Sequence, residues 1–149
     1  MTESSPALLA DQLERAAVTR YARGDLDGAA RRLEVLLEMQ PERAEVWTLL
    51  GVCHRRQRQR NQALRAFRRA VQADPDDMHA LLQLGEMLCS SSRPVEGIPL
   101  LRAVFEKTRV EGKAPEAQPE LARRAGATLE AIQMTLRKWA DTQREGAPS

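Results

Sequence analysis

The side chains suited to metal binding or nucleophilic catalysis are few: two histidines, His54 and His79, and two cysteines, Cys53 and Cys89. Neither histidine has a carboxylate or a cysteine at metal-ligand spacing, and two cysteines cannot build a disulfide scaffold. No phosphate-binding glycine loop, nucleophile motif or acid pair is present. We therefore expect no catalytic residue, no cofactor and no metal site, and we expect both thiols to be reduced packing residues.

Arginine is concentrated between Glu45 and Asp74, a stretch with no acidic residue. It has three interpretations: a solvated helix pair whose long side chains cover apolar surface, a contact for an acidic protein, or a nucleic-acid site. The net charge of +2 and the lack of stacking aromatic residues argue against nucleic acid. The candidate basic contact patch comprises Arg58, Arg60, Arg65, Arg68 and Arg69.

The composition favours helices, because good helix formers dominate and aromatic residues make up only 3%. A chain of 149 residues can bury the core of one domain. No apolar stretch reaches the roughly 20 residues that span a bilayer. The first residues lack the basic start and apolar run of a signal peptide. We expect a cytoplasmic, all-α protein with no small-molecule substrate.

The chain resembles itself at an offset of 34 residues. The recurring positions are small residues that allow helices to approach, large apolar residues that fill space, and prolines that end a helix. The corresponding pairs are Trp47 and Leu81, Leu50 and Leu84, Gly51 and Gly85, Ala29 and Ala63, and Pro41 and Pro75. This period predicts a repeated helix-turn-helix unit.

The middle unit, from Ala44 to Asp77, resembles the tetratricopeptide repeat (TPR), with His54 where a tyrosine is usual. The matching positions are Trp47, Leu50, Gly51, Ala63, Phe67, Ala70 and Pro75. The flanking units are weaker, as end units of a solenoid are. The resemblance implies three units in a short right-handed solenoid, followed by a C-terminal capping helix. The predicted divisions are a lead-in over 1–9, units over 10–43, 44–77 and 78–111, a linker over 112–118, a helix over 119–143 and a flexible tail over 144–149.

Local signals support these helices. Ser5-Pro6 is an N-cap followed by a first-turn proline, and Gly24-Asp25 ends one helix and caps the next. Pro99 falls early in the second helix of the third unit, where it predicts a late start or a kink. Asn61 is the expected cap of the second helix in the middle unit.

The last helix carries one apolar stripe, in which Ala125, Leu129, Ile132, Leu136 and Trp139 recur every three or four residues. An amphipathic helix does not hide such a stripe alone. We expect the stripe to cap the third unit. A contact with a second copy in a homodimer, or a movable helix that competes for the binding groove, are the alternatives.

In TPR proteins the first helix of each unit lines a concave groove that holds a peptide of a partner protein. Carried over to this sequence, the resemblance implies a lining that mixes apolar anchors with charged edges. The predicted groove residues are Asp11, Glu14, Val18, Tyr21, Thr48, Val52, Arg55, Arg56, His79, Leu82, Glu86 and Cys89.

The sequence is also similar to the class II chaperones of bacterial type III secretion, which carry translocator proteins. The similarity rests on Gly51 to Gln57, Ala63 to Val71, Asp74-Pro75 and Leu84 to Cys89. It implies that the groove shields a segment of a secreted client until export. The alternative is a general TPR scaffold or adaptor that docks a folded complex through its Arg-rich face. Neither hypothesis involves catalysis.

Overall fold

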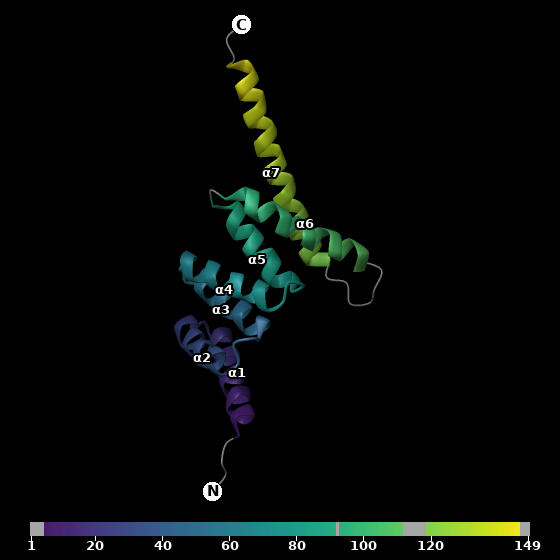
Figure 1. Cartoon of the computed structure of the whole chain (residues 1–149). Helices are drawn as coiled ribbons and strands as arrows, with labels where there is room; N and C mark the ends of the chain where they lie inside the picture. Colours follow the sequence, from purple (N-terminus) through teal and green to yellow (C-terminus); the bar gives the residue numbers. More distant parts are fainter. Residues whose placement is uncertain (1–4, 92, 112–118, 147–149) are drawn as a thin grey trace. The chain divides into compact units, whose positions relative to one another are not determined.

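The computed structural model describes residues 5–91, 93–111 and 119–146, and all regular structure in these ranges is α-helical (Figure 1). The described helices are α1 (Pro6–Ala22), α2 (Leu26–Met39), α3 (Ala44–Arg56), α4 (Arg60–Ala73), α5 (Met78–Cys89), α6 (Pro94–Glu111) and α7 (Pro119–Glu145). The prediction of an all-α chain of consecutive helical hairpins is confirmed. The chain divides into two compact units, residues 1–80 and 81–149. We call these the first unit and the second unit, and we call each helix-turn-helix repeat a hairpin.

The first turns form through side-chain caps. Ser5 Oγ accepts a hydrogen bond from the Leu8 amide at 3.2 Å, and Pro6 occupies the first turn of α1. Gly24 has a φ of 82°, and Asp25 Oδ1 accepts from the Gly28 amide at 2.9 Å to cap α2. Both predicted signals are therefore confirmed.

The turn between α3 and α4 repeats the Gly24 geometry without a glycine. Arg58, which lies 34 residues after Gly24, has a φ of 61°. This left-handed conformation costs an ordinary residue about 1 kcal/mol, because its Cβ crowds the backbone. The repeat thus fixes the backbone of the turn even where the residue type is unfavourable.

In the first unit, α1 packs on α2, α2 on α3, and α3 on α4. The core includes Leu33, Leu36 and Cys53, all fully buried. Gly51 of α3 lies directly against the buried ring of Phe67 from α4, and a Cβ at this glycine would stand 2.6 Å from Phe67 Cε1. The small residue at this repeat position therefore permits the close approach that the sequence predicted.

In the second unit, the same kind of approach joins α5 and α6. A Cβ on Gly85 would lie 2.8 Å from Leu101 Cδ2, and one on Gly97 would lie 2.7 Å from the Gly85 carbonyl oxygen. The first half of α7 packs on α6, with Leu121 and Ala125 buried. The third hairpin thus uses a glycine on each helix, where the middle hairpin uses one glycine and an aromatic ring.

Of the late start or kink expected from Pro99, the late start is wrong, because α6 begins at Pro94 and includes Pro99. α4 begins at Arg60 with Gln59 as its N-cap residue and no side-chain capping bond, so Asn61 is not the cap. The predicted linker at 112–118 lies outside the described residues. α7 reaches Glu145, beyond the predicted end at 143.

The close approach at Gly51 predicts that alanine destabilises the fold at this position but not at Gly126. Gly51→Ala should lower the free energy of unfolding by about 1–3 kcal/mol, because buried Phe67 must shift. Gly126→Ala is the matched control in α7, since its Cβ would lie 3.4 Å from Phe105 and alanine favours helix. Urea unfolding followed by circular dichroism measures both. Equal effects of the two changes would contradict the packing argument.

The left-handed Arg58 predicts an opposite pair of effects in the two turns. Arg58→Gly should raise the free energy of unfolding by about 0.5–1 kcal/mol, and Gly24→Ala should lower it by a similar amount. Arg58→Ala removes the same side chain but keeps the strained backbone, so it should give no gain. If Arg58→Ala stabilises as much as Arg58→Gly, the side chain and not the backbone is the cause.

Candidate functional site

The predicted groove residues of α1 lie on one exposed face of that helix. An open hollow of about 610 Å³ is lined by Asp11, Glu14, Arg15, Val18 and Thr19, three of which were predicted as groove residues. The Val18 side chain is 49% exposed. This face combines an uncovered apolar side chain with carboxylates at its edge.

A cation–aromatic contact connects the predicted faces of α1 and α3. The Arg56 guanidinium carbon lies 5.0 Å from the centre of the Tyr21 ring. Tyr21 and Val52 are half-buried, and Arg55 and Arg56 are exposed. The first helices of the first two hairpins thus present neighbouring predicted residues.

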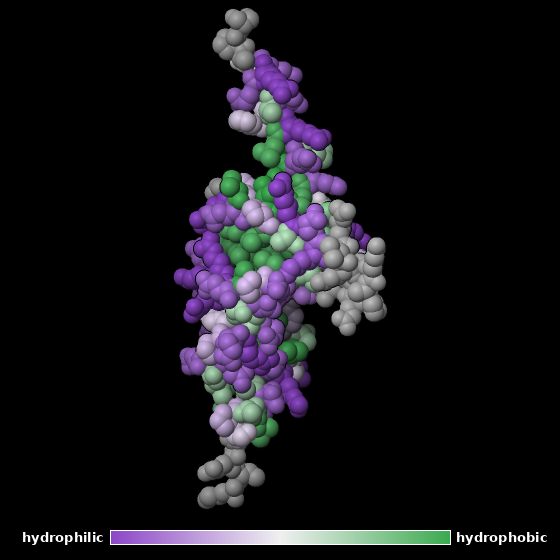
Figure 2. All heavy atoms as spheres, turned by 45° about the vertical axis from the view of Figure 1, so that its right-hand side comes forward, coloured by the Kyte–Doolittle hydropathy of each residue, from purple (hydrophilic) through white to green (hydrophobic). Residues whose placement is uncertain are grey.

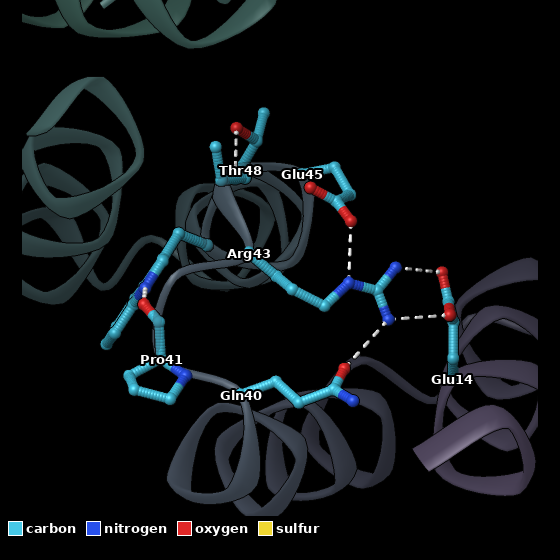
Figure 3. Close-up of polar contacts among 8 residues, drawn as sticks. Glu14, Gln40, Pro41, Arg43, Glu45 and Thr48 are labelled. Atoms are coloured by element: carbon cyan, nitrogen blue, oxygen red, sulfur yellow. Dashed lines mark hydrogen bonds and ion pairs between the residues drawn. The ribbon is translucent and has the colours of Figure 1, made fainter. Parts of the chain in front are cut away.

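Arg43, which the sequence analysis did not single out, fixes one carboxylate of this surface (Figure 3). Its Nη1 and Nη2 donate to the two Glu14 carboxylate oxygens at 3.0 and 3.1 Å, and its Nε donates to Glu45 Oε1 at 2.6 Å. These partners, Glu14 first, raise the pKa of the guanidinium. Burial works against ionisation of Glu45, but hydrogen bonds from its own backbone and from Arg43 still lower its pKa. Glu14 is therefore held in place by an ion pair.

Thr48 and His79 lie close to the end of the first unit. The Thr48 hydroxyl lies 3.0 Å from the Ala44 carbonyl oxygen and 3.3 Å from Asp77 Oδ2. The His79 amide donates to Asp77 Oδ1 at 3.0 Å, and the His79 side chain is exposed. Asp77 thus caps α5 and contacts a predicted groove residue of α3.

In the second unit the predicted residues have different surroundings. Leu82 is 1% exposed and belongs to the core, so it does not present an open surface. Glu86 accepts two hydrogen bonds from Arg124 of α7, at 3.2 Å from Nε and 2.7 Å from Nη2. Cys89 is half-buried, and its sulfur lies against Gly97. The predicted face of α5 is therefore partly engaged by α7.

α7 borders this part of α5 and then extends past it (Figure 1). A hollow of about 340 Å³ is lined by Glu86 and Cys89 on one side and by α7 residues such as Thr128 and Ile132 on the other. Leu136, which also lines this hollow, is 57% exposed, and Trp139 further along α7 is 64% exposed. Apolar side chains are visible on this part of the helix in Figure 2. The apolar stripe is thus covered at its start and uncovered towards its end.

The basic contact patch is also divided by the structure. Arg65, Arg68 and Arg69 of α4 line a cleft whose lining includes none of the predicted groove residues. Arg58 lies in the preceding turn, and Arg60 begins α4. The helical spacing, and not the run of arginines in the sequence, determines which of them share a cleft.

The two thiols differ in burial. Cys53 is fully buried, and this burial raises the pKa of its thiol to about 11. Partial burial also raises the pKa of the Cys89 thiol. Within the described ranges, no group of three or more His, Cys, Asp or Glu side chains is arranged to hold a metal ion. Among the same residues, no helix combines the length and the apolar character needed to cross a membrane.

Comparison with known families agrees with the repeat found in the sequence and the hairpins found in the structure. Residues 20–84 match the tetratricopeptide repeat family. This segment of the chain therefore carries tetratricopeptide repeats. The fold of the chain resembles that of SycD, the type III secretion translocator chaperone of Yersinia enterocolitica, with a TM-score of 0.78, 22% identity, and coverage of 91% of this chain and 90% of that chain. PcrH in complex with the chaperone binding region of PopD gives a TM-score of 0.71, with 24% identity over 86% of this chain and 92% of that chain.

Two curated plant proteins share higher identity over a shorter stretch. The peroxisome biogenesis protein 5 of Arabidopsis thaliana is 37% identical over 103 residues, which are 68% of this chain and 14% of that protein. The CTR9 homolog of the same plant is 37% identical over 86 residues, or 56% of this chain and 8% of that protein. This chain therefore spans only a small part of the curated relatives that it matches.

The Arg43 cluster predicts a defined loss of stability. Arg43→Ala should lower the free energy of unfolding by about 1–2 kcal/mol, because charge-assisted bonds to two carboxylates are lost from a half-buried position. Since the pKa of Glu45 is lowered from 4.5 in the folded chain, its part of this stabilisation is present above that pH and is lost as the pH falls further.

The matched control is Arg31→Ala, which removes an exposed ion pair to Asp27 and should change stability by less than about 0.5 kcal/mol. Urea titrations over a series of pH values measure both variants. A loss for Arg43→Ala that is no larger than that for Arg31→Ala would contradict the prediction.

Proposed function

We propose that this TPR protein is a chaperone that binds an extended or helical segment of a client protein on the inner helices of its repeats. The proposed lining consists of predicted groove residues that remain at least partly exposed. On the first unit these are Asp11, Glu14, Val18, Tyr21, Thr48, Val52, Arg55, Arg56 and His79, and on the second unit they are Glu86 and Cys89. Binding of this kind needs no catalytic group, and we propose no enzymatic activity for the chain.

The observation that carries the proposal is the exposed face of α1 around Val18. Burying the exposed part of an aliphatic side chain against a partner is favourable by roughly 25 cal/mol for each Å² of apolar surface removed from water. Part of the lining has contacts that position it before binding: Glu14 pairs with Arg43, and Arg56 lies over the Tyr21 ring. A client segment would therefore lose its own conformational entropy, while the surface that receives it would lose little.

The structural resemblance supports a proposal for the class of client. One SycD structure holds a peptide of the translocator YopD, and the PcrH structure holds the chaperone binding region of PopD. Both chaperones share the fold of this chain at 22–24% identity. We propose a translocator-like secretion substrate as the client, held in the cytoplasm before export.

The role proposed for α7 is to border the client site on the second unit. Its Arg124 neutralises Glu86, and the hollow between α5 and α7 is lined by Cys89. A client that reaches this hollow would cover the Cys89 thiol. Protection of Cys89 from a maleimide reagent therefore reports on occupancy at this end, while buried Cys53 does not react in the folded chain.

The proposal predicts that a charge on the α1 face abolishes client capture. A photo-reactive amino acid at Val18 identifies the bound client segment, which is then synthesised and titrated by calorimetry. Val18→Glu should weaken this peptide at least about tenfold, because a carboxylate would be buried against an apolar anchor.

Val35 of α2 supplies the matched control, since it is also a valine and is 46% exposed. Val35→Glu should leave the affinity unchanged. The proposal fails if Val35→Glu weakens the peptide as much as Val18→Glu, or if the peptide binds Val18→Glu with full affinity.

A further inference from the structure

The first unit contains a second candidate site, separate from the proposed client surface. A cleft of about 490 Å³ lies between α2 and α4, with α3 beneath it. Trp47 and Leu50 of α3 and Ala66 of α4 supply its apolar part, and Arg65, Arg68 and Arg69 supply cations. None of the proposed client-binding residues lines this cleft.

The cleft continues into a smaller hollow. This hollow has a volume of about 210 Å³ and shares Glu34, Trp47, Leu50 and Arg69 with the larger cleft. Leu37 and Pro41 enlarge its apolar lining, and Glu38 adds a second carboxylate from α2. The two spaces together form a depression with apolar residues beneath it and opposite charges on its two walls.

Two contacts position Trp47 in this depression. Its indole Nε1 donates to the Pro41 carbonyl oxygen at 2.8 Å, and the Arg69 guanidinium carbon lies 5.4 Å from the centre of its ring. The indole beside Leu50 offers an apolar contact to a ligand. Because Trp47 is already ordered by the fold, binding costs it little side-chain conformational entropy. The depression therefore suits one large apolar side chain of a ligand.

The two walls carry opposite charges. α4 has no acidic residue, and its arginines at 65, 68 and 69 follow one helical face towards Gln72. The facing wall on α2 carries Glu34 and Glu38. A continuous polyanion such as nucleic acid would meet these carboxylates, and beside His54 the two linings offer Trp47 as their only large aromatic ring. A peptide can place its carboxylates towards α4 alone.

We propose that the cleft between α2 and α4 binds an acidic peptide segment of a second protein partner. One apolar side chain of that segment rests on Trp47 and Leu50, and its carboxylates pair with Arg65, Arg68 and Arg69. The pairing with arginine can be bidentate, which orients the segment along α4. Because the client surface and the cleft share no residue, the chain can hold a client and this partner at the same time.

The test uses a fluorescein-labelled synthetic peptide with glutamates on both sides of one phenylalanine, followed by fluorescence anisotropy at physiological salt. A second peptide carries serine in place of the phenylalanine. The wild-type chain should bind the phenylalanine peptide at least about tenfold more tightly than the serine peptide, because only the former fills the apolar depression. Equal affinities for the two peptides, or no binding of either, would overturn the proposal.

Substitutions on α4 distinguish peptide binding in the cleft from non-specific electrostatic attraction to the chain. Arg65→Glu with Arg69→Glu should weaken the phenylalanine peptide at least about tenfold. The control, Arg102→Glu with Arg137→Glu, makes the same change in net charge on exposed residues of the second unit and should leave affinity unchanged. Circular dichroism checks folding, and the corresponding pair of alanine substitutions replaces the glutamates if that variant is unfolded.

Two further readouts decide the identity of the ligand. A single-stranded DNA oligonucleotide of the same length and label should bind more weakly than the peptide, and tighter binding of the oligonucleotide would overturn the assignment to a protein partner. Arg65→Glu with Arg69→Glu should retain the affinity for the client peptide of the α1 face. Loss of client binding in that variant, at full folding, would contradict two independent sites.

Discussion

Close packing between the two helices of a hairpin requires that a side chain be nearly absent where they meet. In the middle hairpin Gly51 supplies this position, and the ring of Phe67 occupies the space that a Cβ would take. In the third hairpin Gly85 and Gly97 approach each other through backbone atoms. These contacts set how the second helix lies across the first. In the first hairpin buried Ala17 stands 34 residues before Gly51, and the neighbouring surface of α1 around Val18 remains exposed.

The repeat period carried most of the information about the fold. Residues at an offset of 34 have the same structural roles: Gly24 and Arg58 both have positive φ, and Gly51 and Gly85 both meet a large side chain. Predictions from single residues were less reliable. Pro99 is accommodated within α6, and Asn61 does not cap α4, because the packing of a whole hairpin outweighs one local preference.

The candidate site was predictable only in part, for a physical reason. Position within a repeat indicates which way a side chain points, and it placed Val18 and Tyr21 on an accessible face. Position within a repeat does not predict which residues from distant parts of the sequence contact that side chain. Arg124, 38 residues after Glu86, neutralises that carboxylate, and Arg43 engages Glu14 across 29 residues. Leu82 lies at a position of its repeat that was expected to line the groove, but its side chain is buried. The cleft beside Trp47 likewise depends on two helices that are far apart in sequence.

The divided stripe of α7 has a consequence for local stability. Leu121 and Ala125 are buried and anchor its early turns. In the outer turns, the side chains of Leu136 and Trp139 are more than half exposed. A short helix in water is marginal, so these outer turns persist by propagation from the anchored ones. Their amide protons will consequently exchange faster than those near Ala125, although the backbone is already helical. A partner that binds this segment contacts a helix that is already formed. Binding therefore costs little backbone conformational entropy in α7.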